Sequence, residues 1–232
     1  MKRPGAKSFL LSAIILNLIF VSWLSKIAYA LDPKELEGCI CNSQEKERAL
    51  DCLYKLREVY FRDNKYSEFV DLLRSLCPGD NNIAPYLNYN KALSRYQQLR
   101  YLEESKNWDE YFAKGNDYRD EIVKESNKAV ESLSSDSPEF LYSKLLLYRF
   151  HKDQQDTFAD DALLDLKNSA LEYVKTGKDM GLIKEIADVL ISYDEKSSAK
   201  GLYKLYAQSL VNSDIKDEAL KDIASGFYRE GN

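Results

Sequence analysis

The segments DNKYSEF, residues 63–69, and SKNWDEY, residues 105–111, share one pattern of residue types. Each begins with three polar residues and continues with an aromatic residue, a polar residue, a glutamate and a second aromatic residue. On both sides of each segment, apolar residues recur at every third or fourth position, a spacing typical of one face of an α-helix. The repetition therefore predicts two helical hairpins that turn in the same way.

Helical spacing continues along most of the chain after Gln44. Pro78-Gly79-Asp80 ends the first hairpin, and 134–138 is a second break, in which Ser137 is the expected N-cap and Pro138 the first helical residue. No stretch alternates in the manner of a β-strand. We therefore predict an all-α unit of about nine helices, which cover residues 49–60, 66–76, 86–96, 108–133, 140–148, 162–173, 183–193, 198–211 and 215–228.

The first 30 residues have the layout of a secretory signal peptide. Lys2, Arg3 and Lys7 precede an apolar run at 9–24, and an Ala-Tyr-Ala triplet ends at Ala30. We expect cleavage after Ala30 and export to the periplasm or the extracellular medium. The alternative is an uncleaved membrane anchor, but the run is shorter than the roughly 20 residues that a spanning helix needs.

Charge and composition argue against several functional classes. The chain has 33 basic and 38 acidic residues, and a nucleic-acid partner is disfavoured because phosphate binding requires a concentrated basic face. His151 is the single histidine, its neighbours suggest an exposed helix end, and no Gly-x-Ser-x-Gly motif, glycine-rich phosphate loop or dinucleotide fingerprint accompanies it. The sequence therefore predicts no enzyme, no cofactor and no metal.

Four cysteines, Cys39, Cys41, Cys52 and Cys77, lie early in the chain. Outside the cytosol an even number of cysteines most simply forms disulfides. Cys39 and Cys41 are too close for an easy mutual bridge, so we expect each to bond to one of the other two, which would fasten segment 31–43 as an N-terminal cap. Two weaker alternatives are a zinc site and a lipidated Cys39, for which Glu37 fits badly.

The end of the chain resembles the first helix and turn of a tetratricopeptide repeat, on the residues Leu220, Ile223, Ala224, Phe227, Gly231 and Asn232. Ile186, Val189 and Tyr193 occupy the corresponding places 34 residues earlier, and 34 is the period of that family. The chain is thus similar to the tetratricopeptide-repeat family, most clearly over 186–232. It departs from the family pattern at Arg57, Phe69 and Leu190, where the family has small residues.

The resemblance implies that residues 44–232 form a right-handed α-solenoid of stacked antiparallel helical hairpins. In this family the first helices line a concave face that binds a protein or a peptide. The candidate partner-binding residues on this reading are Tyr89, Asn90, Arg95, Tyr96, Tyr203 and Lys204.

Two other functions fit the same sequence. One is a structural subunit or scaffold of a cell-envelope or secretion assembly, in which membrane contact would come only through an uncleaved leader or an assembly partner. The other is the N-terminal repeat domain of a longer enzyme. Gly231-Asn232 opens a turn into a second helix in the family, so the repeat domain is either truncated at Asn232 or ends there with Gly231 as a helix C-cap.

Overall fold

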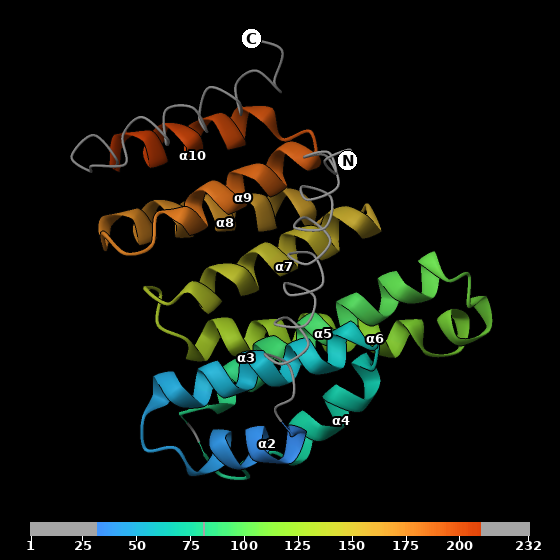
Figure 1. The fold of residues 1–232 in the computed structure, drawn as a ribbon. Helices are drawn as coiled ribbons and strands as arrows, with labels where there is room; N and C mark the ends of the chain where they lie inside the picture. The colour runs from blue at the N-terminus through green and yellow to red at the C-terminus, as the bar shows by residue number, and fades with distance from the viewer. Residues whose placement is uncertain (1–31, 81, 210–232) are drawn as a thin grey trace, which may run out of the picture.

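The computed structural model of the protein describes residues 32–80 and 82–209, which form nine α-helices and no β-strand (Figure 1). The all-α prediction is confirmed, and eight of the helices correspond to predicted stretches. The expected signal peptide at 1–30, the helix at 215–228 and the motif that ends at Asn232 lie outside the described residues. The helices are α2 (Pro33–Asn42), α3 (Lys46–Arg62), α4 (Tyr66–Ser75), α5 (Ala84–Glu104), α6 (Trp108–Ser132), α7 (Pro138–Gln154), α8 (Ala159–Lys175), α9 (Gly181–Ser192) and α10 (Lys196–Ser209).

The helices follow one another in chain order from α2 at one end of the molecule to α10 at the other (Figure 1). Consecutive helices pack against each other from α2 to α8 and again at α9 and α10, and α5 also packs against α7 and α8 against α10. The buried apolar side chains form three clusters. The first joins α2, α3, α4, the start of α5 and the end of α6; the second joins α5, α6 and α7; the third joins α7, α8, α9 and α10. Neighbouring clusters share helices, because α5 and α6 contribute to the first two and α7 to the last two.

The two segments with the shared pattern adopt the same turn. After α3, the Lys65 N–H donates to the Tyr60 carbonyl (2.9 Å) and the Asn64 N–H to the Phe61 carbonyl (3.1 Å). These two bonds define a Schellman motif, in which the residue after the helix adopts a left-handed conformation. Asn64 has φ 56°, and Lys106 has φ 57° in the equivalent turn after α5. The predicted repetition of the turn is confirmed.

The same motif closes two further helices, α7 and α9. There the left-handed residues are Gln155 (φ 53°) and Asp194 (φ 62°). The long bonds run from the Asp156 N–H to the His151 carbonyl (3.2 Å) and from the Glu195 N–H to the Leu190 carbonyl (2.9 Å). Four hairpins in the described part of the chain, α3/α4, α5/α6, α7/α8 and α9/α10, thus share one turn chemistry.

The break before α7 has the predicted capping residues. The Ser137 hydroxyl accepts a hydrogen bond from the Phe140 N–H (3.2 Å), and Pro138 occupies the first turn of the helix. Ser137 therefore satisfies one of the free N–H groups at the helix start, and the fixed φ of proline suits that position. Both assignments are confirmed.

Helix α2 was not predicted, because segment 31–43 was interpreted only as a cysteine-containing cap. The Asp32 carboxylate accepts a hydrogen bond from the Lys34 N–H (3.0 Å), and Pro33 begins the helix. Leu36 and Ile40 are buried against the first cluster. The segment therefore covers the first hairpin as a helix.

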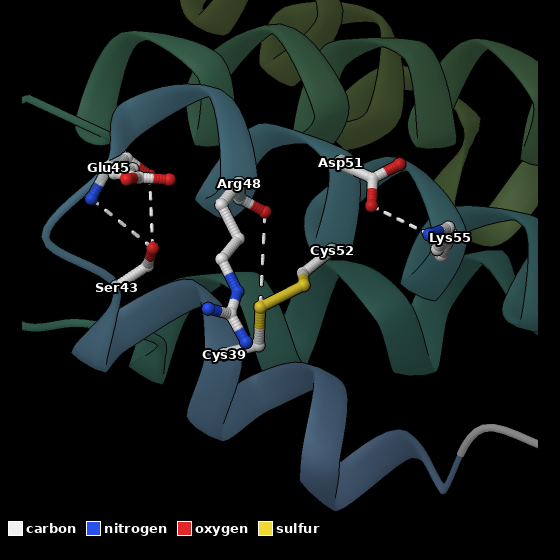
Figure 2. Close-up of a disulfide and its surroundings, with 7 residues drawn as sticks. All are labelled: Cys39, Ser43, Glu45, Arg48, Asp51, Cys52 and Lys55. Carbon is white, nitrogen blue, oxygen red and sulfur yellow. Dashed lines mark hydrogen bonds and ion pairs between the residues drawn. A yellow bond between two sulfur atoms is a disulfide. The ribbon is translucent and has the colours of Figure 1, made fainter.

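Two disulfides attach α2 to this hairpin. Cys39 bonds to Cys52 on α3 (Figure 2), and their Cα atoms are 6.2 Å apart. Cys41 bonds to Cys77 after α4, and their Cα atoms are 5.1 Å apart. The expectation that Cys39 and Cys41 each bond to one of the later cysteines is confirmed. Two such pairs fit an oxidising environment outside the cytosol. Among the described residues, none of the helices has both the length and the apolar character required to cross a membrane.

Candidate functional site

The first helices of the four hairpins, α3, α5, α7 and α9, contribute to one face that contains two cavities. The first cavity, of about 460 Å³, receives residues from all four helices, and we call it the tyrosine cavity. The second, also of about 460 Å³, receives residues from α5, α7 and the end of α9, and we call it the polar cavity. Arg149 on α7 lines both cavities. Arg149 therefore lies at the border between the two cavities.

Apolar and aromatic side chains form much of the tyrosine cavity. Leu145 and Leu146 are buried, and Leu93 and Val189 are half-buried beside them. Tyr89 stacks on Tyr142, with ring centroids 6.3 Å apart and planes inclined by 23°. Burial raises the pKa of Tyr89 to about 12, so its ring stays neutral at physiological pH. This part of the cavity can hold an apolar or aromatic group.

Tyrosine hydroxyls hold the two glutamates of the tyrosine cavity. Tyr54 on α3 donates to Glu139 on α7, and Tyr142 on α7 donates to Glu185 on α9 (2.8 Å). Burial and the neighbouring Glu139 raise the pKa of Tyr54. A neutral tyrosine hydroxyl donates its hydrogen to a carboxylate oxygen. The two pairs therefore connect α3, α7 and α9, which are the first helices of three hairpins.

The two arginines of the tyrosine cavity are bound differently. Arg57 donates to the Asn90 side-chain carbonyl (3.3 Å) and lies over the Tyr54 ring (5.0 Å to the centroid). Arg149 lies over the Tyr96 ring (5.2 Å), and its Nε is buried without a hydrogen-bond partner among the described residues. Within the described part of the chain, no carboxylate oxygen lies within 4.0 Å of either guanidinium. Both positive charges are thus stabilised mainly by aromatic rings and neutral acceptors.

Polar residues dominate the other cavity. Asp153 accepts hydrogen bonds from the hydroxyls of Tyr96 (2.5 Å) and Tyr193 (2.8 Å). Burial and the hydrogen bond to Asp153 raise the pKa of Tyr96. The cavity is completed by residues that include Arg100, Glu103, Gln154 and Ser192. Its surface suits a polar chain with several hydrogen-bonding groups.

Two predicted partner-binding residues line these cavities. Tyr89 lines the tyrosine cavity and Tyr96 the polar cavity, with 7% and 2% of their surfaces exposed. Lys204 is exposed on α10, which is the second helix of its hairpin. The structure therefore brings together Tyr89 and Tyr96 but not Lys204.

The other three predicted residues lie in the interior and line neither cavity. Asn90 is 0% exposed and donates to the Tyr86 carbonyl (2.8 Å). Arg95 is 5% exposed and pairs with Glu121 on α6, and Tyr203 is 1% exposed and donates to Asp188. Arg95 and Tyr203 each find a partner on a neighbouring helix, and a single sequence does not reveal that partner.

Most of the residues that surround the tyrosine cavity are not among the predicted partner-binding residues. The missed polar and aromatic residues are Tyr54, Arg57, Glu139, Tyr142, Arg149 and Glu185. Of these residues, only Arg57 could have been identified from the sequence, because it stands where the tetratricopeptide family has a small residue. A charged side chain at that position indicates an opening beside the helix rather than close helix contact.

His151 is not at an exposed helix end, although it does lie in the last turn of α7. Its side chain is 14% exposed, and its Nδ1 lies 2.8 Å from the Asp156 carboxylate. The Phe158 ring covers it, with centroids 5.6 Å apart. The histidine therefore packs the α7/α8 turn. No group of three or more histidine, cysteine or acidic side chains within 32–80 and 82–209 could hold a metal ion.

No protein-family model, no curated protein and no solved structure matches the chain. The geometry of the two cavities is therefore the basis on which we propose a function.

Proposed function

We propose that the protein is an exported, non-catalytic helical-repeat protein that binds a segment of another protein, or a peptide, along the face formed by α3, α5, α7 and α9. The observation that carries the proposal is the pair of cavities that meet at Arg149. Two adjoining cavities of this size accommodate several consecutive side chains of one extended segment, whereas a compact small molecule needs only one.

The repeat architecture in this proposal is a right-handed α-solenoid of antiparallel hairpins, similar to that of the tetratricopeptide repeats. Its support is the packing of helices in chain order and the shared Schellman turn of four hairpins. A solenoid presents the equivalent helices of successive repeats on one surface, which is the arrangement that a long ligand requires. The cavities on α3, α5, α7 and α9 agree with this arrangement.

A preformed face would keep the entropic cost of binding low. The Tyr54 hydroxyl connects the α3/α4 hairpin with α7/α8, the Tyr142 hydroxyl connects α7/α8 with α9/α10, and the two disulfides fix α2 onto the first hairpin. Side chains that are already ordered lose little freedom when a ligand arrives. The binding surface would therefore change shape little between the free and the bound protein.

Export through a signal peptide cleaved after Ala30 belongs to the same proposal. It is supported by the layout of residues 1–30 and by the two disulfides. Determination of the N-terminal residue of the protein recovered from periplasm or medium tests it. Leu31 is the expected first residue, and an intact Met1 in a membrane fraction would support the uncleaved anchor.

A display selection with random dodecapeptides tests the binding function. The protein with its disulfides formed is immobilised and compared with Val189→Trp, which fills the tyrosine cavity, and with Leu164→Trp, which changes an exposed residue of α8. We expect enriched peptides to bind the wild type and Leu164→Trp and to lose binding to Val189→Trp. Absence of enrichment, or equal binding to all three proteins, would refute a ligand site on this face.

Hydrogen exchange provides an independent readout that needs no variant. An enriched peptide should slow amide exchange in α3, α5, α7 and α9 and leave α8 and α10 unchanged. Protection confined to α8 or α10 would place the ligand elsewhere.

One observation favours a second function, a subunit or scaffold of an envelope or secretion assembly. Trp108 and Phe112 at the start of α6 are 46% and 78% exposed, and their rings lie 6.3 Å apart. Exposed aromatic side chains are enriched where proteins meet. Stable copurification with a complex that is lost in Trp108→Ser/Phe112→Ser would support this function.

A further inference from the structure

Arg149 differs in its surroundings from the acidic residues beside it. Glu139, Glu185 and Asp153 each accept at least one tyrosine hydroxyl, so each has a donor within the protein. Arg149 lies over the Tyr96 ring, its Nε has no hydrogen-bond partner among the described residues, and no carboxylate oxygen among them lies within 4.0 Å. Arg149 is therefore a charged donor on this face that lacks a carboxylate partner among the described residues.

Burial would lower the pKa of Arg149, but Tyr96, Tyr193 and Asp153 together raise it, so the guanidinium remains charged. Arg57 adds a second charge to the tyrosine cavity, with no carboxylate oxygen of the described residues within 4.0 Å. Glu139 is only 9% exposed, which leaves Glu185 as the accessible acid of that cavity. The planar guanidinium group of a charged arginine can bind a carboxylate through two parallel hydrogen bonds.

We propose that the segment bound on this face carries an acidic side chain directly beside an apolar or aromatic one. The apolar side chain enters the tyrosine cavity, against Leu145, Leu146 and Tyr89, and the carboxylate pairs with Arg149. This inference rests on the proposed binding function and names the chemistry of the ligand.

The position of Arg149 indicates a side-chain carboxylate rather than a chain terminus. Because Arg149 lines both cavities, a ligand residue opposite it has a cavity on each side. The bound segment therefore continues past Arg149 in both directions, with its polar part in the cavity of Asp153, Gln154 and Ser192. A C-terminal carboxylate at this point would leave one cavity empty.

The consensus of the selected dodecapeptides is the first test. We expect aspartate or glutamate next to a leucine, phenylalanine or similar residue, with further residues on both sides. A consensus without an acidic residue, a basic residue at that place, or an acidic preference confined to the free C-terminus overturns the inference and leaves the binding function standing. Absence of any enrichment overturns both, so the two failures are distinguishable.

The second test is an affinity cycle measured by calorimetry or fluorescence anisotropy. The leading peptide and its Glu→Gln or Asp→Asn form are titrated against the wild type, Arg149→Gln and the surface control Arg62→Gln. A charged hydrogen-bonded pair in a partly dry site is worth about 1.5–3 kcal/mol, so the amide peptide should bind the wild type roughly 10- to 100-fold more weakly. Arg149→Gln should bind both peptides equally weakly, and Arg62→Gln should match the wild type.

Equal binding of the acid and amide peptides to the wild type overturns the inference, and that measurement needs no variant to fold. Retained preference for the acid peptide in a folded Arg149→Gln overturns it as well. Arg149→Lys keeps the charge but not the planar fork, and we expect it to recover part of the preference.

Discussion

The Nε of Arg95 on α5 lies 2.7 Å from the Glu121 carboxylate on α6. The same carboxylate accepts from Arg74 of α4 at 2.7 Å, and Arg95 also donates to the Ser67 hydroxyl (3.0 Å) and covers the Tyr118 ring (4.5 Å to the centroid). Arg95 and Glu121 therefore cross-link three helices. Arg95 is thus paired within the packing of α4, α5 and α6, although the sequence favoured it as a partner-binding residue.

Glu121→Gln tests this cross-link. Burial alone would raise the pKa of Glu121, but the hydrogen bonds from Arg95 and Arg74 outweigh burial and lower it below the ordinary value of 4.5. A lowered folded-state pKa means that the stabilisation is complete above pH 4.5 and is lost as pH falls through the folded-state pKa. At pH 7 we expect Glu121→Gln to reduce the free energy of unfolding by about 2–4 kcal/mol, since it leaves a buried arginine without its partner.

Urea denaturation at pH 7 and at pH 3.5 provides the measurement. The difference between the wild type and Glu121→Gln should shrink at the lower pH. Glu172→Gln is the matched control, because Glu172 is 65% exposed in its pair with Lys175, and it should change stability by less than about 0.5 kcal/mol. A difference that stays constant with pH would show that the charge of Glu121 contributes nothing.

Tyr89→Phe tests the burial of the Tyr89 hydroxyl through its effect on stability at alkaline pH. Burial raises the pKa of Tyr89 from 10.0 to about 12 in the folded protein. Its stabilisation is therefore complete below pH 10 and is lost as pH rises from 10 through about 12, with a slope of about 1.4 kcal/mol per pH unit. In Tyr89→Phe the loss of unfolding free energy at pH 9, 10 and 11 should be smaller than in the wild type by this contribution, since other tyrosines with raised pKa values, such as Tyr54 and Tyr96, still lose stability there.

Tyr101→Phe is the control for this experiment, because Tyr101 is exposed. It should retain the full alkaline loss. None of the four cysteines is free, so thiol-disulfide exchange has no thiol in the folded protein with which to begin. Identical alkaline slopes for the wild type and Tyr89→Phe would contradict the assigned burial of the hydroxyl.

Gln155→Gly tests the Schellman turn after α7. Gln155 has φ 53°, a conformation that costs an ordinary L-residue roughly 1 kcal/mol and glycine almost nothing. We expect the substitution to stabilise the protein by about 0.5–1 kcal/mol in urea denaturation. Lys124→Gly, at an exposed position inside α6, should instead destabilise it by about 1 kcal/mol. Destabilisation of similar size at both positions would refute the conformational argument.

The sequence was sufficient to predict most of the fold, because the fold depends on local signals. Helical periodicity located eight helices, and Ser137 with Pro138 located the start of α7. Helix α2 was missed although Asp32-Pro33 is an N-cap followed by a proline, the same kind of signal as at α7. The cysteines favoured a disulfide-bonded segment there, and the N-cap signal of Asp32-Pro33 was not used.

The candidate site was much less predictable, because it depends on contacts between helices that are distant in the chain. Tyr54 meets Glu139, and Tyr142 meets Glu185, only after the hairpins pack. A tyrosine on an apolar stripe looks the same in sequence whether its hydroxyl faces a cavity or the core. Arg57 could have been identified as a cavity residue because it replaces a small residue of a repeat pattern. No such departure from a pattern marks Arg149.

The two disulfides should differ in how much they stabilise the protein. Cys39–Cys52 spans 13 residues and Cys41–Cys77 spans 36, and a longer closed loop removes more entropy from the unfolded chain. The entropic model gives about 3 kcal/mol for the first bond and about 4 kcal/mol for the second. Direct comparison of cysteine variants would be confounded, since Cys52 is buried and its replacement also changes the packing of the first cluster.

Reduction of matched variants separates the bond from the packing. In Cys39→Ala/Cys52→Ala the single remaining bond is Cys41–Cys77, and in Cys41→Ala/Cys77→Ala it is Cys39–Cys52. Each variant is unfolded in urea with and without a reducing agent, so that the sequence is the same on both sides of the comparison. Reduction should cost about 4 kcal/mol in the first variant and about 3 kcal/mol in the second. The reverse order would mean that native-state contacts, rather than loop closure, determine the contribution of each bond.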